Sequence, residues 1–309
     1  MHLEAEPQKP SLAFLGPEGT YSHQAAHDHF GDSVHYIKVD SINDAVYSLS
    51  PQIPFAIVPA ENSIFGSVVE TLDCFRHKSV GQTCFIRGET TFAIRHCLLV
   101  KKGVKLQNVK TVLSHEQALG QCKTFLERYL PLASVIKTSS TAEAARMLAD
   151  PTNVDASTSA AICSKLCADL YPVLDVLQEG IQNAETNLTR FWFLAWSMYS
   201  LPPSNPQVER HSLTALLRIS PSPSSLLGCP SVGVARVLQL LQMRMARIDR
   251  RPALLNPPFT DIYFLEVEEI SESDSRDRPR AVQDWKDRIE GKAQSVRSLG
   301  YGCISIGIW

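Results

Sequence analysis

Gly16-Pro17-Glu18-Gly19-Thr20-Tyr21-Ser22 follows the apolar run Ser11-Leu12-Ala13-Phe14-Leu15 near the start of this 309-residue chain. The apolar run predicts a strand and the Gly-Pro cluster a turn, and Thr20 or Ser22 is suited to cap a following helix. In α/β proteins a strand, a Gly-rich turn and a helix together direct backbone N–H groups toward an anion. The stretch therefore predicts an α/β fold and an anion-binding position.

Two further polar segments stand beside apolar, strand-like runs. Pro59-Ala60-Glu61-Asn62-Ser63 follows the run 55–58, and Asn187-Leu188-Thr189-Arg190-Phe191 opens a run that continues to residue 196. The three segments together offer hydroxyls, an amide, a guanidinium and Gly-rich backbone, with no cysteine or histidine nucleophile. Such a set suits a small anionic substrate that is held, removed from water and helped to expel a leaving group.

Short strands alternate with helices over residues 1–200, which predicts a mostly parallel sheet with helices on both faces. One long extended segment is expected at 90–100 and one helix at 116–129. Two βα sets joined by extended segments indicate two lobes with a cleft between them. We therefore expect a two-lobed domain over residues 1–200, with the second lobe at about 92–175.

Residues 201–206 contain three prolines and read as a linker, which we place at 201–210. The remaining chain, 211–309, shows a different pattern. Strands are predicted at 213–219, 246–255, 259–267 and 303–308, and helices at 232–245 and 282–299. This β-α-β-β-α-β order predicts a ferredoxin-like sandwich.

Charge and cysteine usage narrow the class of protein. A formal net charge of −2 gives no electrostatic basis for nucleic-acid binding, which requires a basic face. No apolar run approaches the ~20 residues that a membrane span needs, and residues 1–7 hold no apolar signal segment. The eight cysteines form no C-x-x-C pair. We read them as reduced thiols and expect a cytoplasmic protein.

The motifs resemble those of the prephenate dehydratase family. That family carries G-P-x-G-T-[FY]-S, P-x-E-N-S and T-R-F in this order, and residues 16–22, 59–63 and 189–191 match them. Ser114-His115-Glu116-Gln117-Ala118-Leu119 resembles the S-H-P-Q-A-L of the family, with glutamate in place of proline. The resemblance implies a catalytic fold like a type 2 periplasmic binding protein, followed by a regulatory ACT domain. It also implies conversion of prephenate to phenylpyruvate, water and carbon dioxide, without a metal or an organic cofactor.

The resemblance assigns the chemistry to residues 189–191. Prephenate carries two carboxylates, and Arg190 offers the bidentate geometry that clamps one of them. Thr189 is the candidate donor to the leaving hydroxyl, since a hydroxyl donor strengthens its hydrogen bond as charge develops. Phe191 is expected to position both. The structural alternatives are a surface arginine and a threonine chosen for its strand propensity.

Further residues are expected to bind the substrate. Asn62 follows a buried strand, where α/β sites lie, and Glu61 is expected to orient Asn62 or a backbone turn rather than act as an acid. The alternative for several of the others is helix capping. The full predicted substrate-binding set is Thr20, Ser22, Asn62, Ser63, Ser114, Gln121 and Arg190.

The C-terminal pattern implies an effector site. In the family, a G-A-L turn and an E-S-R-P segment bind phenylalanine between paired ACT domains. Here the corresponding residues are Gly233, Val234 and Ala235, followed by Asp249, Arg250, Arg251 and Pro252. Asp249 and Arg250 depart from the family pattern, yet we expect feedback by phenylalanine and a homodimer or homotetramer.

Three alternatives remain at this stage. His23 and His27 are spaced as zinc ligands on a helix, but without a third ligand we favour an ordinary surface helix. The fold also suits arogenate, the aminated form of prephenate, as the substrate. A metabolite sensor without catalysis is the third, although the intact Thr189-Arg190-Phe191 argues against it.

Overall fold

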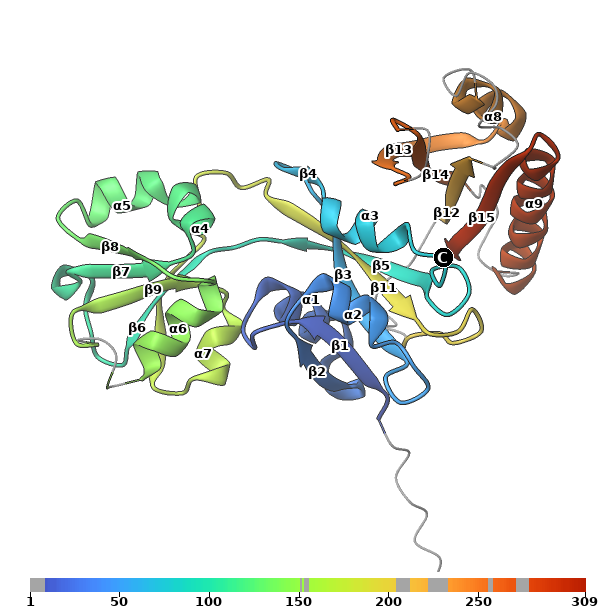
Figure 1. The fold of residues 1–309 in the computed structure, drawn as a ribbon. Helices are drawn as coiled ribbons and strands as arrows, with labels where there is room; N and C mark the ends of the chain where they lie inside the picture. The colour runs from blue at the N-terminus through green and yellow to red at the C-terminus, as the bar shows by residue number, and fades with distance from the viewer. Residues whose placement is uncertain are drawn as a thin grey trace, which may run out of the picture.

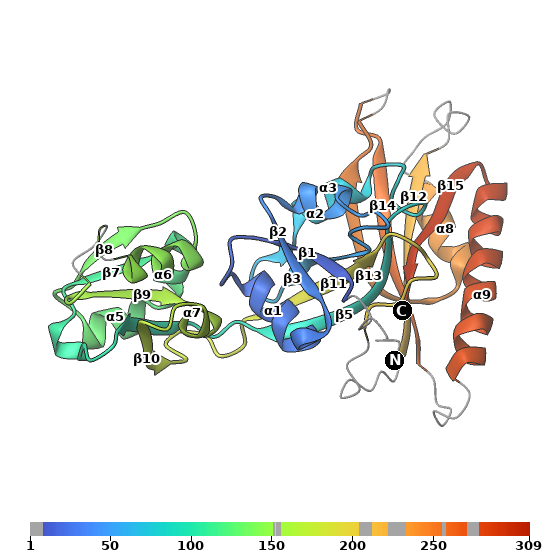
Figure 2. The ribbon, with the colours of Figure 1, turned by 90° about the horizontal axis from the view of Figure 1, so that it is seen from below.

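The structure is a computed structural model that describes residues 9–150, 152, 156–203, 212–221, 233–254, 258–270 and 278–309. Most of the predicted linker lies outside these residues. Two views at right angles show three bodies in a row, with the lobe of strands β6–β10 at one end, the lobe of β1–β3 in the middle and the C-terminal domain at the other end (Figures 1 and 2).

The first lobe is built around strand β1 (Ser11–Leu15), which pairs in parallel with β2 (His35–Val39) and β3 (Phe55–Asn62). Its helices are α1 (Tyr21–Phe30), α2 (Ile42–Tyr47) and α3 (Val69–Phe75), with the short 3₁₀ helix η1 (Gly31–Ser33) and strand β4 (Gly66–Ser67) between them. The first strand–turn–helix unit therefore forms as predicted. The side chains of Thr20 and Ser41 cap α1 and α2.

Two long strands connect the lobes. β5 (Phe85–Ala93) leaves the first lobe and β11 (Leu188–Ala195) returns to it, and β11 runs antiparallel between β3 and β5. The prediction of a mostly parallel sheet is wrong here. A chain that crosses to a second lobe and comes back lays its return strands against the direction of β1–β3, so the sheet is mixed.

The second lobe holds a five-stranded sheet in the order β10-β6-β9-β7-β8. Its strands are β6 (Cys97–Lys101), β7 (Thr111–Ser114), β8 (Ser134–Lys137), β9 (Ser159–Cys163) and β10 (Leu174–Glu179). The helices are α4 (Glu116–Gln121), α5 (Lys123–Tyr129), α6 (Thr141–Ala149) and α7 (Leu166–Leu170), with the 3₁₀ helix η2 (Leu106–Asn108).

Two predicted elements are each divided in the structure. The extended segment expected at 90–100 is interrupted between β5 and β6, where His96 lies. The helix expected at 116–129 breaks at Cys122, whose backbone leaves helical geometry at φ −107°, ψ 11°. Both breaks bring a side chain, His96 or Gln121, to the junction of the two lobes.

The C-terminal segment folds as β12 (Ser212–Pro221), α8 (Gly233–Leu241), β13 (Arg244–Pro252), β14 (Asp261–Ile270), α9 (Arg278–Ser298) and β15 (Tyr301–Ile308). The strand order β13-β14-β12-β15 is antiparallel throughout, as in a ferredoxin-like sandwich. The helix predicted to reach Met245 ends at Leu241, and β13 begins earlier than expected. Alternating exposure along β13 is typical of a strand rather than a helix end, and the strand order places β13 at the edge of the sheet.

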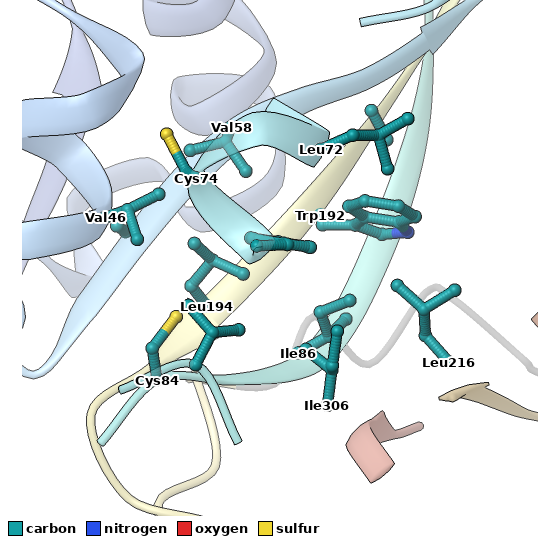
Figure 3. Packing of buried hydrophobic residues seen from close by; sticks show 14 of the residues in the cluster. Val46, Val58, Leu72, Cys74, Cys84, Ile86, Trp192, Leu194, Leu216 and Ile306 are labelled. Carbon is teal, nitrogen blue, oxygen red and sulfur yellow. The ribbon is translucent and has the colours of Figure 1, made fainter. Parts of the chain in front are cut away.

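Strand β11 is buried on both faces. Phe191 and Phe193 pack with the side chains of α1, whereas Trp192 and Leu194 join a core that also contains side chains of the C-terminal domain. Figure 3 shows Trp192 with Leu72 and Ile86 of the first lobe and Leu216 of β12. The C-terminal sheet thus covers the face of β11 opposite to α1, and the two domains share one hydrophobic core.

Candidate active site

Thr189 and Asn62 lie opposite each other on β11 and β3. The Asn62 amide Nδ2 donates to Thr189 Oγ1 at 2.9 Å and to Asn187 Oδ1 at 2.8 Å, and it lies 3.2 Å from the Leu188 carbonyl oxygen. Its Oδ1 accepts from the backbone N–H groups of Ile64 and Phe65 at 2.9 and 3.1 Å. The structure therefore brings together two residues predicted for the site, although they are 127 positions apart.

The polar contacts continue toward the second lobe. Asn187 Nδ2 donates to Gln121 Oε1 at 3.3 Å, and the same oxygen lies 2.5 Å from His96 Nε2. His96 Nδ1 in turn lies 2.6 Å from the Tyr21 hydroxyl. This polar chain (Tyr21, His96, Gln121, Asn187, Asn62, Thr189) connects both lobes at their junction. Asn187, Thr189 and His96 are all buried within it.

Ser63 uses its hydroxyl to hold the segment that leads into β11. Its Oγ donates to the Thr186 carbonyl at 2.7 Å and accepts from the Leu188 backbone N–H at 2.9 Å. The Ser63 backbone N–H in turn donates to the Leu188 carbonyl at 2.8 Å, so the two segments are bonded to each other in both directions. The contacts of Ser63 therefore position Asn187 and Thr189.

The first turn of α1 is held by capping and by the second lobe. Thr20 Oγ1 donates to the Leu15 carbonyl at 2.9 Å and accepts from His23 N–H at 3.3 Å, while the Ser22 side chain is buried. Gly19 has φ +88° and its carbonyl accepts from Ser164 Oγ at 2.7 Å. A Cβ at Gly19 would lie 2.7 Å from Cys167 Sγ, so only glycine permits this contact between the lobes.

Ser114 lies at the end of β7 and is fully buried. Its hydroxyl donates to the Ile162 carbonyl of β9 at 2.5 Å, and the cap of α4 is His115. In this arrangement Ser114 joins two strands of the second lobe, and Gln121 is the residue of this segment that reaches the polar chain.

Arg190 lies on the other face of β11 from Thr189, since neighbouring residues of a strand point to opposite sides. Its guanidinium forms a bidentate pair with Glu266 of β14, at 2.7 and 2.5 Å, and Glu266 is 1% exposed. Burial lowers the pKa of Arg190, but the bonds to Glu266 and the charges of Glu89 and Glu61 outweigh it and raise the pKa overall. The structure does not place Thr189 and Arg190 on a common face.

Glu61 and Phe191 follow the same alternation. Glu61 faces the C-terminal domain, where its carboxylate accepts from Arg247 at 2.8 Å, so it does not contact the Asn62 amide. Phe191 is buried beside α1 on the Thr189 face. It packs with the side chains of Ala25, Ala26 and Phe30 on α1.

The predicted effector segments lie at the start of α8 and on β13. Val234 is half-buried and Ala235 exposed at the beginning of the helix that opens with Gly233. On β13, three of the four predicted residues contact the catalytic domain. Asp249 accepts from Ser67 Oγ at 2.6 Å, Arg251 pairs with Asp73 at 2.6 Å, and the Pro252 carbonyl accepts from Arg76 at 2.9 Å.

Arg250, the fourth of these residues, is exposed and lies 3.5 Å from Asp261. Arg250, which departs most from the family pattern, therefore lies outside the interface between the C-terminal domain and the catalytic domain. The predicted effector segment on β13 is otherwise an interface with α3 and with the turn that follows Asn62.

His23 and the described cysteines are packed inside the protein. His23 is buried, stacks on Phe14 at 4.4 Å and accepts from Gly19 N–H, so it is not the surface residue that was expected. Within the described ranges no group of three or more His, Cys, Asp or Glu side chains is arranged to hold a metal ion. The seven described cysteines are buried free thiols.

No described helix is long and apolar enough to cross a membrane.

A shallow groove of about 360 Å³ lies elsewhere, on the outer side of the second lobe. Its lining is mostly apolar and comes from α4, α5 and the segment before β8. It contains none of the predicted site residues, and we therefore locate the candidate site at the polar chain.

Sequence reasoning missed His96, and Glu266 as the partner of Arg190. His96 precedes the apolar run of β6, and a single histidine beside such a run gives no signal of a functional contact. Glu266 stands in a strand with alternating acidic residues, a pattern that predicts exposure. Asn187 belongs to the motif segment of residues 187–191, but the sequence pattern alone assigns no role to its side chain.

Comparisons with known proteins agree with the motifs. Residues 12–198 match the family described as prephenate dehydratase. The bifunctional chorismate mutase/prephenate dehydratase of Neisseria gonorrhoeae is 31% identical over 291 residues, covering 94% of this chain and 73% of that protein. The Escherichia coli K12 protein of the same name is 32% identical, covering 88% of this chain and 67% of that protein.

Solved structures show the same fold. A prephenate dehydratase from Arthrobacter aurescens, solved in complex with L-Phe, has a TM-score of 0.70 and 25% identity over 96% of this chain and 89% of that one. The Staphylococcus aureus enzyme has a TM-score of 0.61 and 19% identity over 96% and 99%. By its sequence over most of its length and by its fold, the chain belongs to the prephenate dehydratase family.

Proposed function

We propose that prephenate binds beside the polar chain at the lobe junction, in contact with Thr189 and Gln121, and that the Thr189 hydroxyl assists departure of the ring hydroxyl of prephenate. The orientation of the Asn62 amide carries this proposal. Backbone N–H groups can only donate, so the two bonds from Ile64 and Phe65 fix Oδ1 of Asn62 as the acceptor. Its NH₂ group then donates to Thr189 Oγ1.

A threonine hydroxyl has one hydrogen and two lone pairs. Because Asn62 occupies a lone pair of Thr189, the Thr189 hydrogen is left to donate, and no described residue accepts it. Loss of the ring hydroxyl builds negative charge on the departing oxygen while carbon dioxide leaves and the ring becomes aromatic. A preorganised donor aimed at that oxygen stabilises the transition state more than the substrate.

The remaining predicted residues take supporting roles in this proposal. Gln121 has its Oε1 occupied by two donors, so its NH₂ group is the part left to bind a substrate carboxylate or carbonyl. Thr20 uses its hydroxyl in capping, and its backbone N–H donates to the Pro17 carbonyl at 3.3 Å, so the first-turn N–H groups of α1, including that of Ser22, would contribute instead. Ser63 and Asn62 position Thr189 rather than contact the substrate.

We propose that Arg190 holds β11 to the C-terminal domain and does not bind a substrate carboxylate. A clamp would require its guanidinium to leave Glu266 and reach the opposite face of β11. In its observed place Arg190 ties the strand that carries Thr189 to the C-terminal domain. We propose that this pair, with the contacts of Arg247 to Glu61 and of Asp249 to Ser67, couples the C-terminal domain to the site.

We propose that the C-terminal domain is an ACT domain that binds phenylalanine and thereby inhibits the enzyme. Its β-α-β-β-α-β order and the L-Phe complex of the Arthrobacter neighbour support this. Regulation requires that phenylalanine bind one arrangement of the domains better than another. Binding between paired ACT domains would further require a homodimer or homotetramer, which light scattering can test.

The direct test is turnover. Purified protein with prephenate should produce phenylpyruvate, followed by its absorbance, and phenylalanine should lower the rate. Arogenate turnover without prephenate turnover would assign the substrate to the aminated form. An unchanged rate together with no calorimetric binding of phenylalanine would reject the regulatory part and leave the catalytic part intact.

A further inference from the structure

His96 belongs to no predicted motif, yet it occupies the middle of the polar chain. Its side chain is 2% exposed and its two ring nitrogens contact different lobes. Nδ1 lies 2.6 Å from the Tyr21 hydroxyl on α1, and Nε2 lies 2.5 Å from Gln121 Oε1 on α4. A buried histidine with both nitrogens engaged has a defined tautomer, which follows from its partners.

The tautomer can be worked out from fixed groups. Ile64 and Phe65 N–H groups fix the Asn62 amide, so Asn62 Nδ2 donates to Asn187 Oδ1. The Leu188 carbonyl, which can only accept, lies beside the same Nδ2 and agrees with this orientation. Asn187 must then present its Nδ2, the donor, to the next residue in the chain.

That next residue is Gln121, whose Oε1 therefore accepts from Asn187 and must accept from His96 as well. His96 Nε2 consequently carries the hydrogen. Burial lowers the pKa of His96 although the bond to Gln121 raises it, so the ring is neutral near pH 7 and Nδ1 holds a lone pair. Tyr21 donates to that lone pair at 2.6 Å, which is much closer than the Arg95 carbonyl at 3.5 Å, and burial raises the pKa of the Tyr21 hydroxyl, which keeps its hydrogen.

We infer that His96 is a positioning residue for the dehydration, and that its Nε2–H hydrogen bond orients the Gln121 amide so that the Gln121 NH₂ group faces the substrate. This inference rests on the proposed function, because it assigns Gln121 to substrate binding. The geometry that carries it is a continuous set of hydrogen bonds in which donors from both sides, Asn187 Nδ2 and His96 Nε2, converge on Gln121 Oε1. Without the His96 hydrogen, Gln121 Oε1 loses the shorter of its two hydrogen bonds and keeps only the one from Asn187 at 3.3 Å, so the amide is held less firmly.

Two substitutions separate positioning from mere space-filling. His96→Gln can place an amide N–H near the position of Nε2 and keep the donor to Gln121. His96→Asn places its amide near Nδ1, so it keeps a partner for Tyr21 and loses the donor to Gln121. Both variants are polar and smaller than or similar to histidine, so a purely structural role predicts similar kinetics for the two.

Steady-state kinetics with prephenate provide the test. We expect His96→Asn to reduce kcat/KM up to about 10²-fold, and His96→Gln to restore most of that loss. Equal kcat/KM values for the two variants would overturn the inference. The parallel variant Thr189→Val reports on the proposed function: full activity there with a split between the His96 variants would reject only the role of Thr189.

A second measurement does not depend on turnover or on the variants' stability. Nitrogen-15 NMR of the wild-type protein, with the His96 signals assigned by specific labelling, distinguishes a protonated Nε2 from a protonated Nδ1. The protonated Nε2 form is expected at pH 7. A dominant Nδ1–H form would contradict the chain of donors and overturn the inference.

Discussion

Replacing Thr189 by valine removes one hydroxyl and little else. Valine has nearly the same shape, and Thr189 is 8% exposed on a strand bonded on both sides, so β-branched packing is retained. The lost hydrogen bond from Asn62 costs about 1 kcal/mol of folding free energy, because Asn62 keeps Asn187 and the Leu188 carbonyl as acceptors. We therefore expect Thr189→Val to stay folded.

The expected effect on catalysis is much larger. Removing one preorganised donor to a developing oxyanion costs about 2.7–4 kcal/mol in the transition state, which is about 10²–10³ in kcat. Since the hydrogen bond strengthens only as the ring hydroxyl departs, kcat and kcat/KM should fall by similar factors while KM changes little.

The assay is the appearance of phenylpyruvate from prephenate, with thermal unfolding measured on the same samples. Thr189→Ser is the matched control, because it keeps the hydroxyl and loses only a methyl group. A folded Thr189→Val enzyme with wild-type kcat would refute the reasoning. So would a variant whose only change is a raised KM, because Thr189 would then bind substrate and transition state equally.

Three other outcomes follow from contacts described above. Gly19→Ala should destabilise the protein by about 1–3 kcal/mol in urea unfolding, since φ +88° is strained for alanine, and adding Cys167→Ala should recover only the part due to the clash. Glu266→Ala should lower the free energy of unfolding by about 3–5 kcal/mol, since it removes the buried bidentate partner of Arg190 and leaves only the more distant carboxylates of Glu61 and Glu89, at 3.9 and 3.7 Å; a loss below about 1 kcal/mol would contradict a buried pair. Burial lowers the pKa of His96, so below pH about 6.5 the unfolded chain binds a proton more readily than the folded protein does. The free energy of unfolding therefore decreases as the pH is lowered. His96→Gln should reduce this pH dependence between pH 7.5 and 5.

The sequence predicted the elements that carry the site better than it predicted their faces. Thr20 caps a helix where expected, and the segments that hold Asn62 and Thr189 meet. These features depend on local turn chemistry and on apolar runs, which a sequence shows directly.

The sequence does not show on which side of β11 the Arg190 side chain lies. A strand with one solvated face alternates polar and apolar residues, but residues 191–195 are all apolar because both faces are buried. With no period of two, Thr189 and Arg190 appeared to belong to one site. The end of α8 was missed for a related reason, since Met243 and Met245 continue the apolar pattern of the helix, although Met243 lies between α8 and β13 and Met245 belongs to β13.

The alternation that separates Thr189 from Arg190 also explains how one strand can serve both domains. Adjacent residues of a strand are about 3.3 Å apart, so a shift of the backbone at Arg190 also shifts Thr189, whose hydroxyl we propose as the donor to the leaving group. Allosteric coupling needs about 1–3 kcal/mol, and a buried pair such as Arg190–Glu266 resists breakage by about 3–5 kcal/mol. A displacement of the C-terminal sheet is therefore expected to move β11 rather than break the pair. Thr189 would then leave its alignment with the substrate while its bond to Asn62, on the other strand, opposes the shift.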